Sequence, residues 1–329
     1  MPANLPPEYF EKEAQLRAAR SNREKIALLE ELLSVVPKHK GTDKLRADLR
    51  RRLSKLKESP QKKKSASRQA SPFHIDPEGA GQIVLLGPPN TGKSSLLAAL
   101  SKARPEVADF PFTTWMPMPG MMGYENIKIQ LIDLPPLNRE YGESEMYDLI
   151  RRSDLALVVI DIQAQPLQQI EDSEAMLRER KLVLRSRSRG ESPDTPEGQA
   201  VPCLVAVNKV DDEQLLEDFQ VLQELLQEQW DLVPVSARTG RYLERFKPAL
   251  FKALDVIRVY SKAPGKQPDF DEPFVLPAGS RVEDLAAKLH KDFLTKLKSA
   301  RVWGESVFDG QMAGRDHVLH DGDVVELRT

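Results

Sequence analysis

The chain has 329 residues, of which 40% are hydrophobic and 30% are charged, and its formal net charge is -2. This length and apolar content predict a folded protein with two domains, or one domain with appendages. The near-neutral balance excludes a polycation that binds nucleic acid over its whole surface, so any such affinity has to come from a local patch.

The cysteine content and the hydropathy of the chain indicate in which cellular compartment the protein is expected. The single cysteine, Cys203, excludes an internal disulfide and fits a reducing environment. It lies in an apolar run and is expected to be an inert core residue. The N-terminus shows no apolar signal segment, and no apolar run reaches the length of a transmembrane helix. We therefore expect a cytoplasmic protein without a membrane partner.

Apolar residues between positions 8 and 57 recur at helical spacing on both sides of a break at 37–41. Thr42 precedes the charged first turn of the second run and is a candidate N-cap. Two such runs around a short turn predict a helical hairpin over residues 1–58. The two apolar stripes are Ile26, Leu29, Leu32, Leu33 and Val36, and Leu45, Leu49, Leu53 and Leu56.

The second of these helices is strongly basic, and the basic run continues into a segment rich in Ser, Lys and Pro. Two interpretations stay open: a solvated face of a small hairpin, or a surface that contacts RNA phosphates. Residues 59–79 are predicted to be a linker. The basic residues are Lys44, Arg46, Arg50, Arg51, Arg52, Lys55, Lys57, Lys62, Lys63 and Lys64.

Residues 87–94 read Gly-Pro-Pro-Asn-Thr-Gly-Lys-Ser. The apolar run 83–86 precedes them and the helix-prone run 95–100 follows, which favours a phosphate-binding P-loop over a chance turn. Backbone N–H groups and the N-terminal end of the helix would then face a phosphate. Lys93 is expected to reach the β- and γ-phosphates, and the Ser94 hydroxyl to bind Mg²⁺.

Thr113 and Thr114 follow the P-loop helix, where a GTPase carries its first switch. By themselves two threonines would indicate an ordinary loop, and their place between two motifs favours the switch. Residues 124–134 alternate and predict a strand that ends in Asp133, which P-loop enzymes use to hold Mg²⁺, usually through water. Position 136 is a proline where GTPases have a glycine, so the N–H that contacts the γ-phosphate is missing.

Two continuous apolar runs, 155–161 and 201–207, predict buried parallel strands. The second ends in Asn208-Lys209-Val210-Asp211, a pattern typical of guanine recognition. The Asp211 carboxylate can accept hydrogen bonds from N1–H and the exocyclic amine of guanine, whereas adenine would leave it unsatisfied. Residues 231–235 predict a further strand that leads to Ser236 and Ala237, whose backbone N–H can face the guanine O6. These features argue against an ATP-dependent enzyme.

The segment between 162 and 200 begins with helical character and continues as an Arg- and Ser-rich insertion over residues 185–200 or so. A solvated loop is favoured there over an RNA contact. Short runs at 257–260, 274–276 and 324–327 predict strands, and 282–298 predicts an amphipathic helix, together a two-layer domain. His290, His317 and His320 lack metal-ligand spacing and are expected to be surface or core residues.

With these motifs in place, the chain resembles the Obg and developmentally regulated GTP-binding (DRG) branch of translation-factor-type GTPases. The motifs that carry the resemblance lie at 87–96, 110–114, 208–211 and 236–237. The stretches 257–262, 276–285, 300–304 and 314–325 resemble a TGS domain, a small ubiquitin-like β-grasp module. The resemblance implies slow GTP hydrolysis and work on ribosomes or ribosome assembly.

The resemblance also implies roles for single residues. Asn90 matches a P-loop asparagine that helps bind K⁺, which stabilises transition-state charge in place of an arginine finger. Thr114 matches the switch threonine on Mg²⁺, and Leu137 occupies the place of the glutamine that orients water in Ras-like GTPases. Three features depart from the family: Pro136 replaces a glycine, the glycine-rich stretch after it is absent, and the large inserted domain of DRG proteins is missing or shrunken.

The predicted architecture is α/β. A P-loop GTPase domain, with a mostly parallel sheet and helices on both faces, occupies residues 80–255, and a TGS domain occupies residues 256–329. The predicted function is GTP hydrolysis by a factor that associates with the ribosome or RNA through the TGS domain and the basic arm, without DNA specificity. The alternative is a GTP-binding interaction module with little hydrolysis, because of Pro136.

The candidate site residues follow from these assignments. Catalytic roles are expected for Lys93, Thr114 and Asn90, and Mg²⁺ ligands are expected to be Ser94, Thr114 and Asp133. The expected ligands are GTP or GDP, Mg²⁺ and K⁺. The nucleotide-binding candidates are Gly87, Pro88, Pro89, Asn90, Thr91, Gly92, Lys93, Ser94, Ser95, Asp133, Asn208, Lys209, Asp211, Ser236 and Ala237.

Overall fold

The computed structural model describes residues 71–101, 116–137, 143–186, 197–226 and 229–328, together with scattered positions between 12 and 49. The chain divides into two units, Met1–Ala70 and Ser71–Thr329. Among the described residues, no helix combines the length and the apolar character needed to cross a membrane.

The first unit contains a small apolar cluster. Leu29, Leu32, Val36 and Leu49 are buried against one another. The first three belong to one predicted apolar stripe and Leu49 belongs to the other, so residues of both stripes share one cluster. The basic residues predicted on the second helix lie outside the described residues, as does most of the predicted linker.

The second unit begins with a seven-stranded sheet of order β2-β3-β1-β4-β6-β5, in which β7 also pairs with β6. All pairs are parallel except that of β2 with β3. The predicted, mostly parallel sheet is therefore confirmed. The strands are β1 (Gln82–Leu86), β2 (Met118–Tyr124), β3 (Ile127–Asp133), β4 (Leu155–Asp161), β5 (Leu182–Ser186), β6 (Gln199–Asn208) and β7 (Leu232–Pro234).

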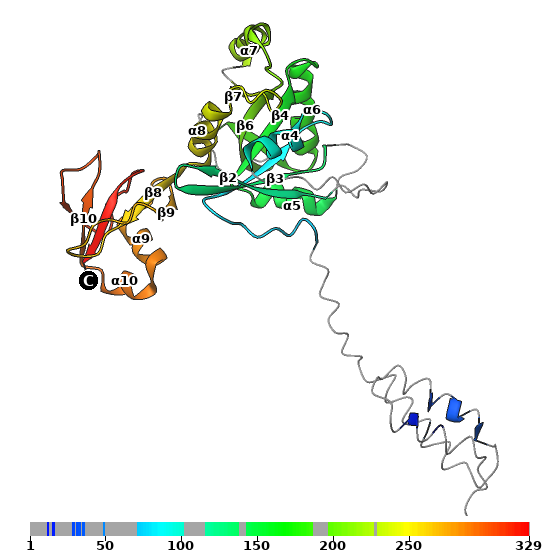
Figure 1. The fold of residues 1–329 in the computed structure, drawn as a ribbon, viewed down its shortest axis with the longest axis horizontal. Helices are drawn as coiled ribbons and strands as arrows, with labels where there is room; N and C mark the ends of the chain where they lie inside the picture. Colours follow the sequence, from blue (N-terminus) through cyan, green and yellow to red (C-terminus); the bar gives the residue numbers. More distant parts are fainter. Residues whose placement is uncertain are drawn as a thin grey trace, which may run out of the picture. The chain divides into compact units, whose positions relative to one another are not determined.

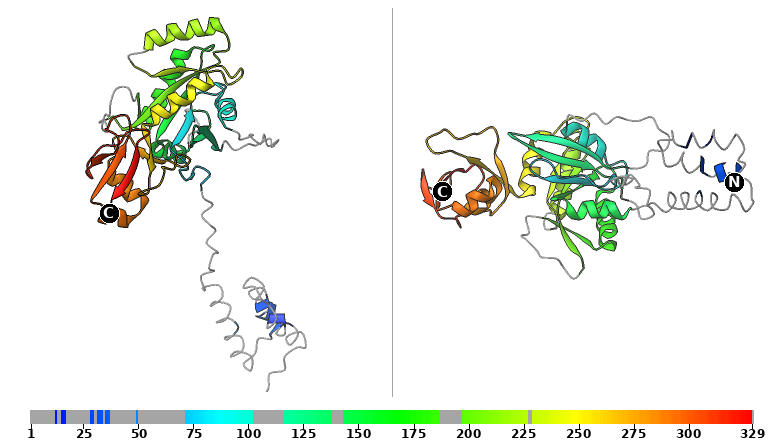
Figure 2. Two further views of the ribbon diagram at one scale, coloured as in Figure 1. Left: turned by 60° about the vertical axis from the view of Figure 1, so that its left-hand side comes forward. Right: turned by 90° about the horizontal axis from the view of Figure 1, so that it is seen from below.

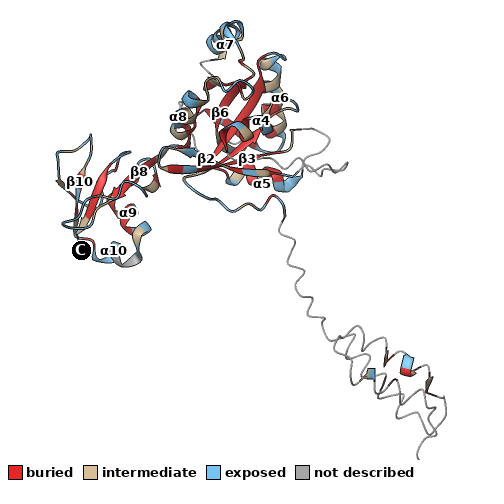
Figure 3. Ribbon diagram, viewed as in Figure 1, coloured by how far each residue is buried: buried red, intermediate tan, exposed pale blue. Residues whose placement is uncertain are grey.

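Helices cover both faces of this sheet (Figures 1 and 2). One hydrophobic core joins the sheet to α5, α6 and α7, and the other joins it to α4 and α8. Every residue of β1 and β4 is buried. Figure 3 shows that the interior of this sheet is largely buried. The helices are α4 (Lys93–Leu100), α5 (Ser144–Arg152), α6 (Pro166–Glu179), α7 (Glu213–Leu226) and α8 (Leu243–Leu254).

Two predictions about this sheet need correction, and the strand β2 was not predicted. The strand predicted from Tyr124 begins at Ile127, because Tyr124 ends the antiparallel strand β2. β2 has little strand signal, and one of its glycines, Gly120, lies where a Cβ would be 2.8 Å from a methyl of Leu97 on α4. The predicted Arg- and Ser-rich loop is narrower than 185–200, because Arg185 lies in edge strand β5 and β6 begins at Gln199.

The C-terminal part forms a second sheet of order β11-β10-β12-β8-β9. Its hydrophobic core includes Val259 of β8, Val302 of β10 and Leu285 of α9. The predicted two-layer domain is thus present. Its elements are β8 (Val256–Ser261), β9 (Phe274–Pro277), α9 (Val282–Leu289), α10 (Lys291–Lys296), β10 (Ser299–Trp303), β11 (Gln311–Ala313) and β12 (Val324–Arg328).

The helix predicted over 282–298 is broken. His290 has an extended backbone with φ of -171°, and its N–H donates to the carbonyl of Ala286, which ends α9. A shorter helix, α10, follows, and Ser299 already belongs to β10. Leu297 between them is 1% exposed, and its carbonyl accepts from the Arg315 guanidinium at 2.9 Å. Leu297 thus joins the core of the second sheet from the short segment between α10 and β10.

Polar contacts join the turn between β2 and β3 to the second sheet. The Asn126 amide donates to the Tyr260 hydroxyl at 2.8 Å and to the Phe270 carbonyl at 2.9 Å. Arg258 of β8 pairs with Glu125 of the same turn and lies 4.9 Å from the centre of the Phe251 ring of α8. The two sheets of this unit are therefore joined by hydrogen bonds, an ion pair and a cation–π contact.

Candidate nucleotide-binding site

The candidate residues lie on loops that follow parallel strands of the larger sheet. The P-loop follows β1, Asp133 ends β3, and Asp161 ends β4. Asn208 ends β6, and Ser236 comes shortly after β7. The carboxyl ends of parallel strands meet at one edge of the sheet, where ligands bind in open α/β folds. The tertiary structure thus brings together segments separated by well over a hundred residues.

Two glycines allow the P-loop its close backbone approach. Gly87 has a φ of +141°, and a Cβ on it would be 2.4 Å from the carbonyl oxygen of Val159 on β4. Gly92 caps α4 with a φ of +89°, and a Cβ there would be 2.4 Å from the Asn208 side-chain nitrogen. Asn90 between them also has a left-handed backbone, with a φ of +62°. A side chain at either glycine would displace a neighbouring strand or loop.

The Lys93 side chain folds back onto the P-loop backbone. Its ammonium donates to the carbonyls of Gly87 at 3.1 Å and Pro88 at 2.8 Å. Burial lowers the pKa of Lys93 to about 8, and the nearby Asp133 carboxylate offsets part of this shift. A buried ammonium whose proton is weakly held would be strongly stabilised by an added phosphate. The loop therefore has the chemistry of an anion site.

Ser94 and Asp133 place oxygen ligands side by side. The Ser94 hydroxyl donates to one Asp133 carboxylate oxygen at 2.5 Å. The other carboxylate oxygen is buried without a hydrogen-bond partner among the described residues. Burial raises the pKa of Asp133, while Ser94 and Lys93 lower it. Hydroxyl and carboxylate oxygens are ligands that Mg²⁺ prefers, and the unpaired oxygen fits a role toward a cation or its water.

Asn208 connects the P-loop to the loop after β7. Its amide nitrogen donates to the Thr91 carbonyl at 2.8 Å, and its amide oxygen accepts from the Ala237 N–H at 3.1 Å. Asn208 is 1% exposed, and its bond to the Thr91 carbonyl is buried. One side chain thus sets the distance between the expected phosphate and base subsites.

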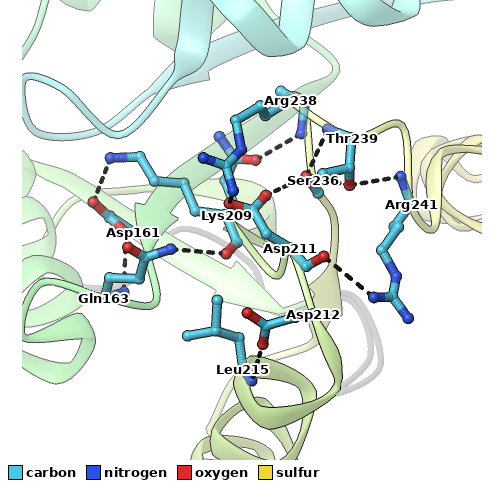
Figure 4. A network of polar contacts seen from close by, with 12 residues as sticks. Asp161, Gln163, Lys209, Asp211, Asp212, Leu215, Ser236, Arg238, Thr239 and Arg241 are labelled. Atoms are coloured by element: carbon cyan, nitrogen blue, oxygen red, sulfur yellow. Dashed lines mark hydrogen bonds and ion pairs between the residues drawn. The ribbon is translucent and has the colours of Figure 1, made fainter.

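Charged side chains surround the expected base subsite (Figure 4). Asp211 accepts from the Ser236 hydroxyl at 2.5 Å and pairs with Arg238 at 2.7 Å. Lys209 pairs with Asp161 at 2.5 Å. The sequence motifs included Asp211, Lys209 and Ser236 but gave no sign of Asp161 or Arg238, because no local pattern links either residue to a distant partner.

The segment after Asp133 is held against the P-loop strand. The N–H of Leu134 donates to the Leu85 carbonyl at 3.1 Å, and the N–H of Leu137 donates to the Gly87 carbonyl at 3.1 Å. The Leu137 side chain is 3% exposed and belongs to the main core. Pro136 has no N–H to donate, and the next N–H in the chain, that of Leu137, is already bonded to a P-loop carbonyl.

The remaining candidates differ in their surroundings. Pro89, Ser94 and Ser95 are exposed at the start of the loop and helix, where a ligand has access to them. Thr114 lies outside the described residues, so its predicted role toward Mg²⁺ stays a prediction. Cys203 is a buried free thiol in β6, and burial raises its pKa, as expected of an inert core residue.

Comparison with known proteins gives the class first. Residues 82–186 match the family model described as a 50S ribosome-binding GTPase, and residues 257–329 match the TGS domain. The first match covers the P-loop, Asp133 and β4, and the second covers the C-terminal sheet. Fold and site therefore define a P-loop GTPase followed by a TGS domain.

Relatives that match along most of the chain give the family. An uncharacterized GTP-binding protein of Methanocaldococcus jannaschii is 31% identical over 362 residues, with 92% of this chain and 92% of that one covered. Developmentally-regulated G-protein 3 of Arabidopsis thaliana is 28% identical, with 92% of this chain and 98% of that one covered. The chain belongs to the family of developmentally regulated GTP-binding proteins.

Solved structures support the same fold. A GTP-binding protein of Pyrococcus horikoshii OT3 has a TM-score of 0.50 at 15% identity, with 75% of this chain and 99% of that one covered. The YchF GTPase of Schizosaccharomyces pombe has a TM-score of 0.52 at 13% identity, with 77% and 99% covered. The 362 aligned positions of the archaeal relative exceed the 329 residues of this chain, so that relative has residues absent here.

Proposed function

We propose that this protein binds GTP and GDP at the edge of its larger sheet, hydrolyses GTP slowly, and works as a ribosome- or RNA-associated factor. The observation that carries the proposal is the bond from the Asn208 amide to the Thr91 carbonyl at 2.8 Å. It ties the guanine-type motif to the P-loop, so that one nucleotide can contact both. The family of developmentally regulated GTP-binding proteins supports the same reading.

Guanine selectivity is assigned to Asp211. A carboxylate can accept from both N1–H and the exocyclic amine of guanine, whereas the adenine edge offers no such pair of donors. The expected test is Asp211→Asn, which replaces one acceptor oxygen by a donor. Affinity for GDP should fall strongly and affinity for xanthosine diphosphate should rise, because xanthine has a carbonyl where guanine has its amine. Unchanged GDP binding would remove Asp211 from this role.

Hydrolysis is proposed to be in-line attack of water on the γ-phosphate. Lys93 would leave the Gly87 and Pro88 carbonyls and neutralise charge on the β- and γ-phosphate oxygens. Ser94, Asp133 and Thr114 would hold Mg²⁺, which supplies further charge stabilisation when bound. Asn90 would help hold K⁺ in place of an arginine finger. Leu137 has no polar group to orient water, so turnover is proposed to be slow.

GTP turnover in potassium against sodium buffer, with and without ribosomes, tests this proposal. Potassium-dependent hydrolysis that ribosomes accelerate is the expected result. The Asn90→Ala variant should lose the potassium effect but keep GDP binding, whereas Lys93→Ala should lose turnover in both buffers. Tight GTP binding without turnover under any condition would overturn the proposed hydrolysis and leave a binding module.

Association with ribosomes or RNA is proposed for the TGS domain and the basic arm. It is supported by the match to a 50S ribosome-binding GTPase model and by the TGS match. Neutralising Arg50, Arg51, Arg52 and Lys55 should weaken ribosome association and flatten its salt dependence. Neutralising charges elsewhere on the protein would not reproduce the loss of positive charge within the arm. The control is therefore a variant whose arm is scrambled in sequence at the same net charge. Unchanged binding would exclude the arm.

A further inference from the structure

The carboxylate that the proposed function assigns to guanine already has two partners in the folded protein. One Asp211 oxygen accepts from the Ser236 hydroxyl at 2.5 Å, and the other pairs with an Arg238 guanidinium nitrogen at 2.7 Å. The Asp211 side chain is 8% exposed, whereas the Arg238 side chain is 77% exposed. In Figure 4 Arg238 reaches down to Asp211 from the loop that follows β7. The Asp211 carboxylate is thus held in a buried position, whereas the Arg238 side chain lies at the surface and can rotate away from it.

The chemistry of the two competing groups is alike. A guanidinium presents N–H donors in a planar fork that matches a carboxylate. The Watson–Crick edge of guanine presents N1–H and an exocyclic N–H in a similar planar arrangement, aimed at the same kind of acceptor. A carboxylate that is largely removed from water is costly without a partner. Arg238 supplies that partner while no base does.

We propose that Arg238 is a placeholder, which occupies Asp211 in the nucleotide-free protein and is displaced by the guanine edge. This inference rests on the proposed GTP binding and adds a step to it. A base that cannot replace the guanidinium at Asp211 has to break the ion pair without compensation. Guanine compensates for the lost ion pair with its own two donors. Because specificity is a difference of affinities and every base has to displace Arg238, the pair lowers the affinity for nucleotide without altering the preference for guanine.

The neighbouring groups keep the rest of the loop in place during the exchange. The Thr239 N–H and hydroxyl both contact the Ser236 hydroxyl, at 3.0 Å and 2.8 Å. Arg241 donates to the Asp211 main-chain carbonyl at 3.2 Å and pairs with Glu213. None of these contacts uses the Arg238 side chain. Displacement of Arg238 thus requires rotation of one exposed side chain and no rearrangement of the backbone.

The test is stopped-flow binding of a fluorescent GDP analogue to wild type and Arg238→Ala. The Arg238 side chain is 77% exposed, so solvent screens its ion pair with Asp211, and the variant should bind GDP about two- to fivefold more tightly. The gain should appear in association, with dissociation unchanged, because Arg238 is absent from Asp211 in the bound state. The melting temperature of the nucleotide-free variant should fall, and that of the GDP complex should not. Arg245→Ala, an exposed arginine on α8, controls for net charge.

A chemical complement makes the test specific to the guanidinium group. Dilute guanidinium chloride should slow GDP association to Arg238→Ala more than to wild type, against equal potassium chloride. Weaker GDP binding with faster dissociation in Arg238→Ala would overturn the inference, because Arg238 would then contact the bound nucleotide. Unchanged binding by a protein that does bind GDP would also overturn it. Absence of GDP binding by wild type would instead refute the proposed function.

Discussion

Asn208 and Thr91 are joined by a buried hydrogen bond of 2.8 Å from the Asn208 amide to the Thr91 carbonyl, although 117 positions separate them in the sequence. The same amide group accepts from the Ala237 N–H. A single side chain therefore holds three loops at the edge of the sheet. Its position explains why Gly92 has to lack a side chain, since a Cβ there would be 2.4 Å from the Asn208 nitrogen.

Asn208→Ala is expected to weaken both folding and nucleotide binding. The substitution leaves the Thr91 carbonyl and the Ala237 N–H without this partner, and a buried unsatisfied polar group costs about 1–3 kcal/mol. The free energy of unfolding and the GDP dissociation constant should change together. Gln220→Ala, an exposed amide on α7, is the control and should change neither. Normal GDP affinity in Asn208→Ala would contradict the bridging role.

Nucleotide binding is expected to take up a proton through Lys93. The pKa of Lys93 is lowered to about 8 by burial, and the phosphates should raise it again. Binding at about pH 9 should therefore consume close to one proton per site. Calorimetry in two buffers of different ionisation enthalpy measures this uptake. Lys93→Arg stays charged and should show none at that pH.

The same group should give nucleotide-free protein an unusual pH dependence. Between about 8 and the ordinary lysine value of 10.5, the unfolded chain binds more protons at Lys93 than the folded chain. The free energy of unfolding contributed by this group therefore rises with pH across that window and is lowest below it. Urea unfolding of wild type and Lys93→Met along this window checks the sign. A wild-type curve parallel to that of the variant would contradict the lowered pKa.

Pro136→Gly is expected to increase GTP turnover. The proline lacks the N–H through which GTPases contact the γ-phosphate, and the next N–H, of Leu137, donates to the Gly87 carbonyl. One restored hydrogen bond to a charged oxygen is worth about 1.5–3 kcal/mol, or roughly tenfold or more in rate. Single-turnover hydrolysis measures the effect, and Pro135→Gly controls for backbone flexibility. Equal rates in the two variants would show that Pro136 does not limit hydrolysis.

Arg258→Ala is expected to loosen the TGS domain from the GTPase domain. The guanidinium contacts Asp321 at 2.7 Å, Glu125 and the Phe251 ring, and its side chain is 13% exposed. Its removal should cost about 1–3 kcal/mol and should speed proteolysis near β8. A double-mutant cycle with Glu125→Ala should give a coupling energy of about 0.5 kcal/mol, since Glu125 is largely exposed. A coupling energy of zero would exclude the ion pair as a link.

The sequence alone was sufficient to predict many of the strands and loops of the larger domain. Continuous apolar runs predicted β1, β4 and β6, because a strand buried on both faces has to be apolar throughout. The motifs around Lys93 and Asp211 were assigned correctly to the loops after β1 and β6, because each motif directly follows one of these apolar runs. β2 escaped prediction, because its pattern of Pro, Gly and Met is shaped by contact with α4 and by edge position rather than by strand propensity.

The sequence by itself determined the local features, namely the buried strands, a glycine-bounded phosphate loop, and the carboxylate of a guanine-recognition motif. These depend on neighbours in the chain, through backbone freedom and apolar periodicity. Only the tertiary structure decided which distant groups meet. The pairing of Asp211 with Arg238, of Lys209 with Asp161, and of Asn208 with Thr91 depends on how parallel strands align their carboxyl ends, and no local pattern encodes that alignment.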